Sequence, residues 1–453
     1  MTVSHTTPAE RRRVIAATTI GTAIEWYDFF LYAAVAGLVF KQTMFAPLGA
    51  ASATIAAFMT VGLSFLFRPL GAILAGYFAD RFGRRAVLMV TLFAMGLATT
   101  LIGLIPTYAT IGWLAPAILV MLRIIQGISA GGEWSSAVLM SVEHAPVDKR
   151  GLFGSGPQVG APAGLLLSSA ALALMNMIAP GDAFVEWGWR VPFLFSLVLM
   201  LLGWWIRTGV DESPVYAEMA QDRSHEAKNP LGTLFANHFP LVITAALAFA
   251  ANSAVGYMTT GGYVQSYVTN PDGLAIPRGD ILWAVTASAA TWMISTAFAG
   301  WLSDYLGRTI TLTIGFVVQF IGVAVLFPLV DTGEIAKIYG ALIFLAVGIG
   351  LSYGQVAALY AEFFPASVRA SGTAISYALG AILGGAFAPT IAARLYESTG
   401  GNRAITIYLL VMTTVGLFIS IIMRERKGIP LGHEYEDIQS QGHFVWQPRP
   451  ASL

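Results

Sequence analysis

Five ionisable side chains lie inside stretches of this chain that are otherwise apolar: Glu25, Asp28, Arg68, Arg123 and Glu133. An ionisable group at the centre of a lipid bilayer costs about 3 kcal/mol on insertion scales, so each of these side chains is a candidate for function. Glu25 and Asp28 stand three residues apart on one helix face, and two neighbouring carboxylates cannot both ionise cheaply. Such a pair suits the uptake and release of a proton, and Glu133 is the third candidate for this role.

The two arginines supply the opposite charge. A guanidinium can neutralise a carboxylate or hold a substrate carboxylate through two hydrogen bonds, and doing one excludes the other. Arg123, Gln126, Ala130 and Glu133 share one stripe of their span. Arg123 and Gln126 are substrate-binding candidates, together with Tyr32 and Arg68. The alternative for the charged groups is a permanent buried ion network that holds the spans together. Arg68 precedes Pro69, where a gate or structural role is as reasonable as substrate contact.

The chain must hold these side chains within a membrane, because 56% of its 453 residues are hydrophobic and only 11% are charged. Soluble domains are about 25% charged. Segments of about 20 apolar residues predict membrane-spanning helices. The twelve predicted spans are at about 14–40, 53–79, 86–106, 112–138, 151–178, 189–208, 238–268, 279–301, 310–330, 336–361, 371–396 and 403–423.

A polar stretch separates six spans from six. Most Lys and Arg residues fall on the face that carries both termini, which the positive-inside rule places in the cytoplasm. The chain has no cysteine, which excludes disulfides and thiolate metal sites, and no nucleophile or metal motif lies among the spans. We therefore expect neither an enzyme nor a metal site. The predicted parts are a cytoplasmic tail (1–13), an N-terminal six-helix bundle (14–208), a cytoplasmic linker (209–237), a C-terminal six-helix bundle (238–423) and a cytoplasmic tail (424–453).

Two loop patterns occur once in each half. Gly-x3-Asp-x2-Gly-Arg appears at 76–84 and 300–308, and Glu-x2-Pro-x3-Arg appears at 143–150 and 362–369. The aspartate can face a helix N-terminus and the arginine can pair with an acid on another helix, which together would latch a cytoplasmic gate. An ordinary basic loop with a turn glycine is the alternative. The gating candidates are Asp80, Arg84, Glu143, Arg150, Asp304, Arg308, Glu362 and Arg369.

The loop at 76–85 resembles the signature between the second and third helices of the major facilitator superfamily, and 300–308 resembles its weaker second copy. Within that superfamily the chain is most similar to the metabolite:proton symporter family, over about residues 12–425. The resemblance implies an all-α fold of twelve transmembrane helices in two pseudo-symmetric six-helix bundles around a central cavity, in the cell (inner or plasma) membrane. The segments that carry it are Glu25–Phe29, Arg68–Gly71, Arg123–Gly127, Gly131–Glu133, Trp187–Phe193 and Glu212–Pro214.

The C-terminal half has no charge in the middle of a predicted span. Spans 7 and 10 line the cavity in the proteins that this chain resembles, so Asn252, Tyr257, Tyr353 and Gln355 are further substrate-binding candidates, with ordinary helix packing as the alternative. We expect proton-coupled uptake of a small polar metabolite by alternating access, most readily an organic acid anion such as a shikimate-like acid or a di- or tricarboxylate. The alternatives are an uncoupled facilitator and a symporter of a zwitterion such as proline or betaine.

The expected partners are the substrate and the lipid bilayer. The net charge of zero gives no reason to expect a nucleic acid. We expect no cofactor beyond the proton as coupling ion, and a protein that works as a monomer.

Overall fold

Hydropathy places the helices of this protein, and its small residues decide where they break. The computed structural model describes residues 8–82, 84–131, 133–208 and 230–448, with side chains for 15–74, 89–131, 133–135, 137–206 and 232–448. Eleven helical segments there are long and apolar enough to cross a membrane, and Met89–Ile102 is a shorter apolar helix. In order along the chain they match the twelve predicted spans, so the predicted all-α membrane fold is confirmed.

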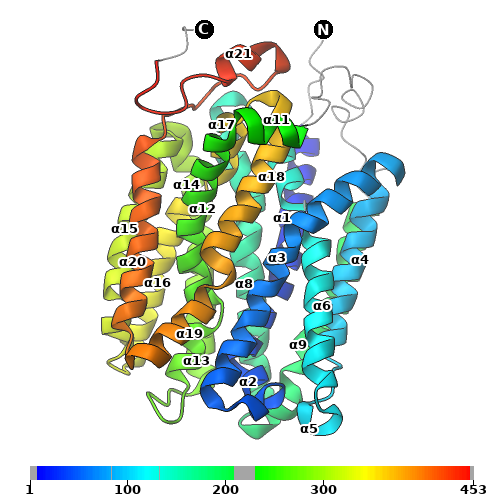
Figure 1. Cartoon of the computed structure of the whole chain (residues 1–453), viewed down its shortest axis with the longest axis vertical. Helices are drawn as coiled ribbons and strands as arrows, with labels where there is room; N and C mark the ends of the chain where they lie inside the picture. Colours follow the sequence, from blue (N-terminus) through cyan, green and yellow to red (C-terminus); the bar gives the residue numbers. More distant parts are fainter. Residues whose placement is uncertain (1–7, 83, 132, 209–229, 449–453) are drawn as a thin grey trace.

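The helices of the N-terminal half stand side by side (Figure 1). They are α1 (Pro8–Val35), a π-helical turn (Ala36–Phe40), α2 (Lys41–Thr43), α3 (Ala50–Phe82), α4 (Arg84–Ile102), α5 (Tyr108–Ile111), α6 (Leu114–Ala130), α7 (Glu133–Glu143), α8 (Arg150–Ile178), a second π-helical turn (Phe184–Gly188) and α9 (Arg190–Thr208).

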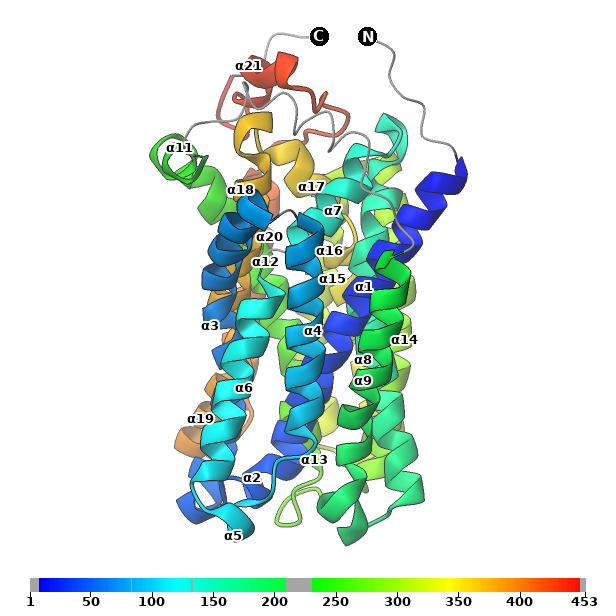
Figure 2. The same cartoon turned by 90° about the vertical axis from the view of Figure 1, so that its right-hand side faces the viewer.

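The C-terminal half follows the same plan and ends in a tail on the face that carries both termini (Figures 1 and 2). Its helices are α11 (Pro230–Asn237), α12 (Phe239–Thr260), α13 (Tyr263–Val268), α14 (Arg278–Leu306), α15 (Arg308–Val330), α16 (Ile335–Tyr353), α17 (Val356–Phe363), α18 (Arg369–Gly380), a π-helical turn (Ala381–Ala386), α19 (Ala388–Thr399), α20 (Arg403–Ile422) and α21 (Glu436–Gln439). Between the halves, α8 packs along α14 and α3 packs against α19.

Four spans predicted as continuous are divided in the structure. The span at 112–138 divides into α6 and α7, that at 238–268 into α12 and α13, that at 336–361 into α16 and α17, and that at 371–396 into α18 and α19. At the second break Gly262 has φ +90°, a conformation that L side chains rarely adopt, and its Cα lies against the backbone of Ala33 in the other half. A close approach of the two halves therefore requires glycine here, and the helix ends at it.

Gly127 on α6 provides a test of this close packing. A Cβ added there would meet the backbone of Ser64 on α3, which cannot rotate away. We expect Gly127→Ala to lower the melting temperature of the purified protein, because such overpacking costs about 1–3 kcal/mol. Gly340→Ala on α16 is the matched control, since a Cβ there meets open space and alanine favours a helix. Equal melting temperatures for the two variants would contradict the packing described here.

Candidate functional site

A buried ion pair joins α1 to α3. Arg68 Nη2 lies 3.3 Å from Glu25 Oε1, and both residues are at most 6% exposed. The guanidinium also lies over two aromatic rings, with its Cζ 4.5 Å from the centre of Phe65 and 5.5 Å from the centre of Trp26. The rings shield one side of the cation from water and attract it through their π-electrons. Arg68 Nε, however, has no hydrogen-bond partner among the described residues.

Asp28, one turn further along α1, contacts other helices. Thr99 on α4 donates a hydrogen bond to Oδ2 at 2.8 Å, and Ser196 on α9 donates one to Oδ1 at 2.6 Å. All three side chains are at most 2% exposed. The two acids that the sequence places on one helix face are thus held by different partners, Glu25 at α3 and Asp28 at α4 and α9.

Arg123 is held mainly by the backbone of α3 rather than by an acid. It donates to the carbonyl oxygens of Thr60 and Val61 at 3.1 and 3.0 Å, and to Ser64 Oγ at 2.8 Å. A fourth bond, 2.7 Å long, goes to Gln126 Oε1. Most of its hydrogen-bonding capacity is therefore used within the protein, in contrast to that of Arg68.

A chain of hydrogen bonds connects this arginine to Asp28. Gln126, which accepts from Arg123, donates to Thr99 Oγ1 at 2.7 Å, and Thr99 contacts the Asp28 carboxylate. Tyr32, another predicted site residue, lies with its ring 3.8 Å below the Arg123 guanidinium. The predicted residues of α1 and α6 are thus brought together, although Arg123 and Asp28 communicate through two intermediates.

Glu133 is separated from this group by the helix break. It is the first residue of α7 and half-buried, whereas Arg123 and Gln126 belong to α6. The single stripe predicted for this span is therefore interrupted. The signal for the break was present in the sequence, because two adjacent glycines precede Glu133.

Three of the four candidates in the C-terminal half differ in whether their polar groups are used in helix packing. Asn252 donates to Ile349 O at 3.1 Å and to Ser352 Oγ at 2.6 Å, so it joins α12 to α16. Tyr257 reaches across to the other half, with its ring centre 6.0 Å from Trp26. Gln355 is completely buried, and its side-chain nitrogen and oxygen have no partner among the described residues. Of these three, only Tyr257 and Gln355 have polar groups not used in helix packing.

Tyr353, the fourth candidate, lies in a layer of aromatic side chains between the halves. Its ring centre is 5.9 Å from that of Trp292, and its carbonyl oxygen accepts a hydrogen bond from Gln158 of the other half at 3.2 Å. Trp134 stacks on Tyr377 across the two halves at 3.5 Å. Trp134 directly follows the candidate Glu133, which is a sequence signal for this side chain. Its contact with Tyr377 in the other half, however, cannot be read from the sequence.

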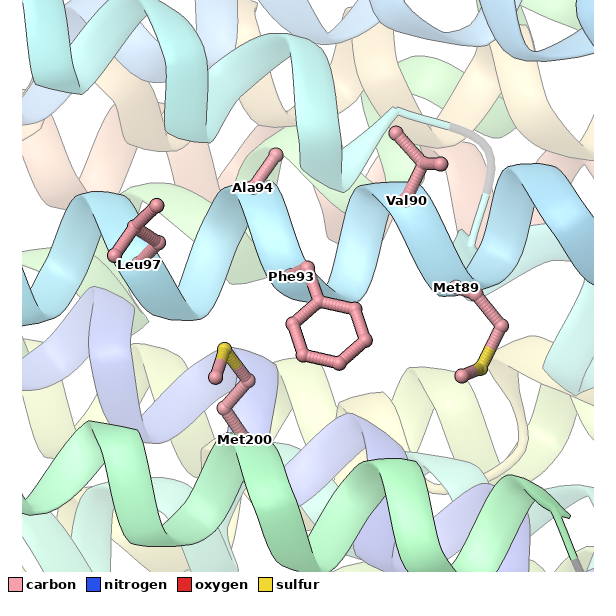
Figure 3. A pocket seen from close by; sticks show the side chains of 6 residues that line it. All are labelled: Met89, Val90, Phe93, Ala94, Leu97 and Met200. Carbon is pink, nitrogen blue, oxygen red and sulfur yellow. The ribbon is translucent and has the colours of Figure 1, made fainter.

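The arginines border a small void, and a larger hollow lies elsewhere. The void, between Arg68 and Arg123, has a volume of about 10 Å³, room for roughly one water molecule. The larger hollow, about 390 Å³, is an open groove on the outer surface between α4 and α9, lined by Met89, Val90, Phe93, Ala94, Leu97 and Met200 (Figure 3). This apolar lining has no group to recognise a polar metabolite, so the groove is not the substrate site.

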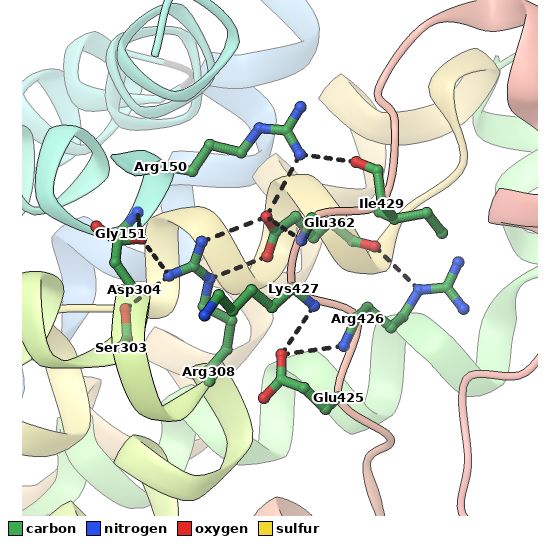
Figure 4. Close-up of polar contacts among 12 residues, drawn as sticks. Arg150, Gly151, Ser303, Asp304, Arg308, Glu362, Glu425, Arg426, Lys427 and Ile429 are labelled. Carbon is green, nitrogen blue, oxygen red and sulfur yellow. Dashed lines mark hydrogen bonds and ion pairs between the residues drawn. The ribbon is translucent and has the colours of Figure 1, made fainter. Parts of the chain in front are cut away.

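The second loop motif closes the cytoplasmic end of the α8–α14 interface (Figure 4). The Asp304 carboxylate accepts from the N–H groups of Gly151 and Leu152, at 2.7 and 2.8 Å, in the first turn of α8. These N–H groups have no partner within the helix, and the helix dipole favours an anion there. Arg308 binds Asp304 at 2.7 Å and Glu362 at 3.0 Å, so one arginine connects both acids.

The Glu-x2-Pro-x3-Arg motifs meet across the halves. Arg150 Nη1 lies 3.4 Å from Glu362, and the equivalent Arg369 Nη1 lies 3.9 Å from Glu143. These contacts are longer than those of Arg308. Two further gating candidates, Asp80 and Arg84, lie outside the residues whose side chains the structure describes.

Comparison with known proteins identifies the family to which this chain belongs. The family model of the Major Facilitator Superfamily matches residues 18–389 and 274–449. The chain belongs to the major facilitator superfamily. The solved proton:xylose symporter XylE bound to 6-bromo-6-deoxy-D-glucose superposes with a TM-score of 0.74 over 93% of this chain and 98% of that one, at 17% identity, and so shares the fold.

Other members of the superfamily are more similar in sequence. The chain is 36% identical to the inner membrane metabolite transport protein YhjE of Escherichia coli, over 92% of this chain and 95% of that protein. It is 36% identical to the E. coli shikimate transporter, over 91% and 94%. It is 31% identical to the proline/betaine transporter of Salmonella typhimurium, over 93% and 85%. This superfamily protein is therefore a multi-pass membrane transporter of a small metabolite, and not an enzyme.

The C-terminal tail of this transporter packs on the cluster of gating candidates around Glu362, a contact that the sequence did not predict. Met423 forms an antiparallel bridge with Phe444, and His443 is buried against the ring of Phe363. Burial lowers the pKa of His443 to about 3, and repulsion from Arg426 adds to the effect. The docked tail therefore holds this imidazole neutral.

This burial predicts a pH-dependent tail. An exposed histidine has a pKa of about 6.5, so docking is at full strength above that pH and weakens as the pH falls toward 3. We expect the backbone amides of 424–447 to lose roughly tenfold in hydrogen-exchange protection between pH 7.5 and 5.5, after correction for intrinsic rates. His443→Phe, which keeps a ring against Phe363, should remove the pH dependence, and the exposed His433→Gln should retain it. A pH dependence unchanged by His443→Phe would contradict this assignment.

Proposed function

We propose that this transporter carries a small organic acid anion into the cell together with a proton. The observation that carries the proposal is the buried Glu25–Arg68 ion pair, whose Nη2–Oε1 distance is 3.3 Å. A proton on Glu25 removes the charge that holds Arg68. The guanidinium can then bind a substrate carboxylate in its place. Proton and anion together leave the charge of the site unchanged, which favours their binding as a pair.

Arg68 is better suited than Arg123 to bind the substrate. Arg123 already makes four hydrogen bonds within the protein, whereas the Nε of Arg68 has no partner among the described residues. Tyr257 contributes an aromatic ring from the opposite half, 5.1 Å from that of Phe65 beneath the guanidinium. A substrate held by Arg68 would therefore touch both halves, as alternating access requires.

The surroundings of Arg68 favour a substrate with one carboxylate. One guanidinium with an unused donor matches one carboxylate, and a di- or tricarboxylate would leave buried charge unpaired. Shikimate, named for one relative, is a ring with a single carboxylate, which suits the aromatic neighbours Trp26 and Tyr257. The same rings favour a second candidate, a zwitterion such as betaine, because aromatic faces attract a quaternary ammonium group.

Uptake into proteoliposomes tests the proton coupling, with shikimate and glycine betaine as the probes. An inward proton gradient of about one pH unit can concentrate the substrate about tenfold if one proton accompanies it. We expect Glu25→Gln to lose this accumulation and to keep substrate exchange without a gradient, because a neutral side chain leaves Arg68 free. The matched control is Glu334→Gln, an exposed acid on the opposite face from the gate.

Three outcomes of this experiment would change the proposal. Uptake by the parent protein that ignores the gradient would establish an uncoupled facilitator. Full accumulation by Glu25→Gln with loss in Asp28→Asn would move the coupling proton to Asp28, whose buried carboxylate is the second candidate. Accumulation of betaine but not shikimate would favour the zwitterion.

A further inference from the structure

The C-terminal tail lies between the two gate arginines. Arg150, from the N-terminal half, donates to the carbonyl oxygen of Ile429 at 2.7 Å. Arg369, its counterpart in the C-terminal half, donates to the carbonyl oxygen of Leu431 at 2.9 Å. Both bonds are shorter than the direct arginine–acid contacts across the halves, which are 3.4 and 3.9 Å. The tail segment Ile429–Leu431 thus supplies the closest polar contacts of both arginines with groups beyond their own helices.

Buried polar side chains hold this segment on the C-terminal half. Arg426 is 7% exposed and donates to the backbone oxygen of Glu362 at 3.0 Å. Glu425 accepts from the N–H of Thr309 at 2.9 Å, at the start of α15. The tail is therefore fastened next to the same Glu362 that both Arg150 and Arg308 contact.

Gln439 adds a second attachment. It is 1% exposed, its Oε1 accepts from Ala366 N–H at 2.7 Å, and its Nε2 donates to the carbonyl oxygens of Pro430 and Gly432 at 2.7 and 2.8 Å. One side chain thereby clamps the Ile429–Leu431 segment from both sides. Such a fully satisfied buried amide fixes a single backbone path.

We propose that the segment Glu425–Gln439 is a third component of the cytoplasmic gate, which must release Arg150 before this side can open. Apart from the bond to Arg150, the hydrogen bonds described above join this segment to the C-terminal half or lie within the tail itself. Separation of α8 from α14 and α17 therefore breaks the Arg150–Ile429 bond while the tail stays with its own half. Glu425, Arg426 and Gln439 act as positioning residues for this bond. This inference goes beyond the proposed symport. It requires only that the transporter works by alternating access, whatever its substrate or coupling ion.

Gly428 offers a selective test, because it turns the chain just before Ile429. Its φ is +85°, and a Cβ would meet only Val147 Cγ1 at 3.9 Å, so alanine would strain the turn without a clash. Gly400→Ala is the matched control: φ is +71°, space is open, and the residue lies in the loop between α19 and α20. Gln439→Ala is the second variant, which loosens the same segment by another route.

Opening can be followed by thiol labelling, because the chain contains no cysteine. Ser155→Cys is nearly isosteric, 2% exposed, and lies beside Gly300 between α8 and α14. We expect a water-soluble maleimide to label this cysteine roughly fivefold faster in Gly428→Ala and in Gln439→Ala, at an unchanged melting temperature of the spans. Gly400→Ala should label at the parent rate.

Asp304→Asn is the positive control, because it weakens the contact between α14 and α8 without changing the tail. If it speeds labelling while Gly428→Ala and Gln439→Ala both label at the parent rate, the tail is not part of the gate and the proposal is overturned. If Gly400→Ala labels as fast as Gly428→Ala, the effect is not specific to the tail and the proposal is likewise overturned. The assay uses neither substrate nor a proton gradient, so a failure of the symport experiment would leave its result unaffected.

Discussion

The structure depends on the need to neutralise Arg68 inside a membrane-spanning helix. A buried guanidinium without a counter-charge is far more costly than a paired one, so Arg68 needs an anion in every state of the transport cycle. Glu25 is that anion in the structure described here, at 3.3 Å. If Glu25 takes up a proton, a substrate carboxylate becomes the natural replacement. This requirement alone would link proton movement to substrate movement.

The two halves share their loop motifs but not the charges in their spans. Asp304 and Arg308 repeat the motif of Asp80 and Arg84, yet the charged side chains in the middle of the predicted spans belong to the first half. The second half places an uncharged side chain, Tyr257, beside Trp26 and Phe65 of the first half. The repeat therefore accounts for the pseudo-symmetric arrangement of the helices. The ion pair lies where the two halves differ in sequence. The tail adds a second asymmetry, because it lies against both gate arginines but is attached to one half.

Much of the fold could be predicted because lipid imposes a simple rule on helix length and composition. The buried charges Glu25 and Arg68 were also visible, since they interrupt apolar segments. Their pairing was not, because the facing of a helix cannot be fixed to one residue from hydropathy. Arg123 shows a second limit of sequence-based prediction. It donates to backbone carbonyls of α3, and because every residue has a carbonyl, the sequence does not indicate which ones accept. The docking of the tail could not be predicted for the same reason, because Ile429 contacts Arg150 through its backbone carbonyl.

The most direct test of the account is to count protons taken up when an acid binds. Calorimetric titration of the purified protein with a stabilising organic acid, in two buffers of different ionisation enthalpy, gives this number without transport. The account predicts uptake of about one proton per acid bound by the parent protein and none by Glu25→Gln. Equal proton uptake by both proteins would contradict the exchange of Glu25 for substrate at Arg68.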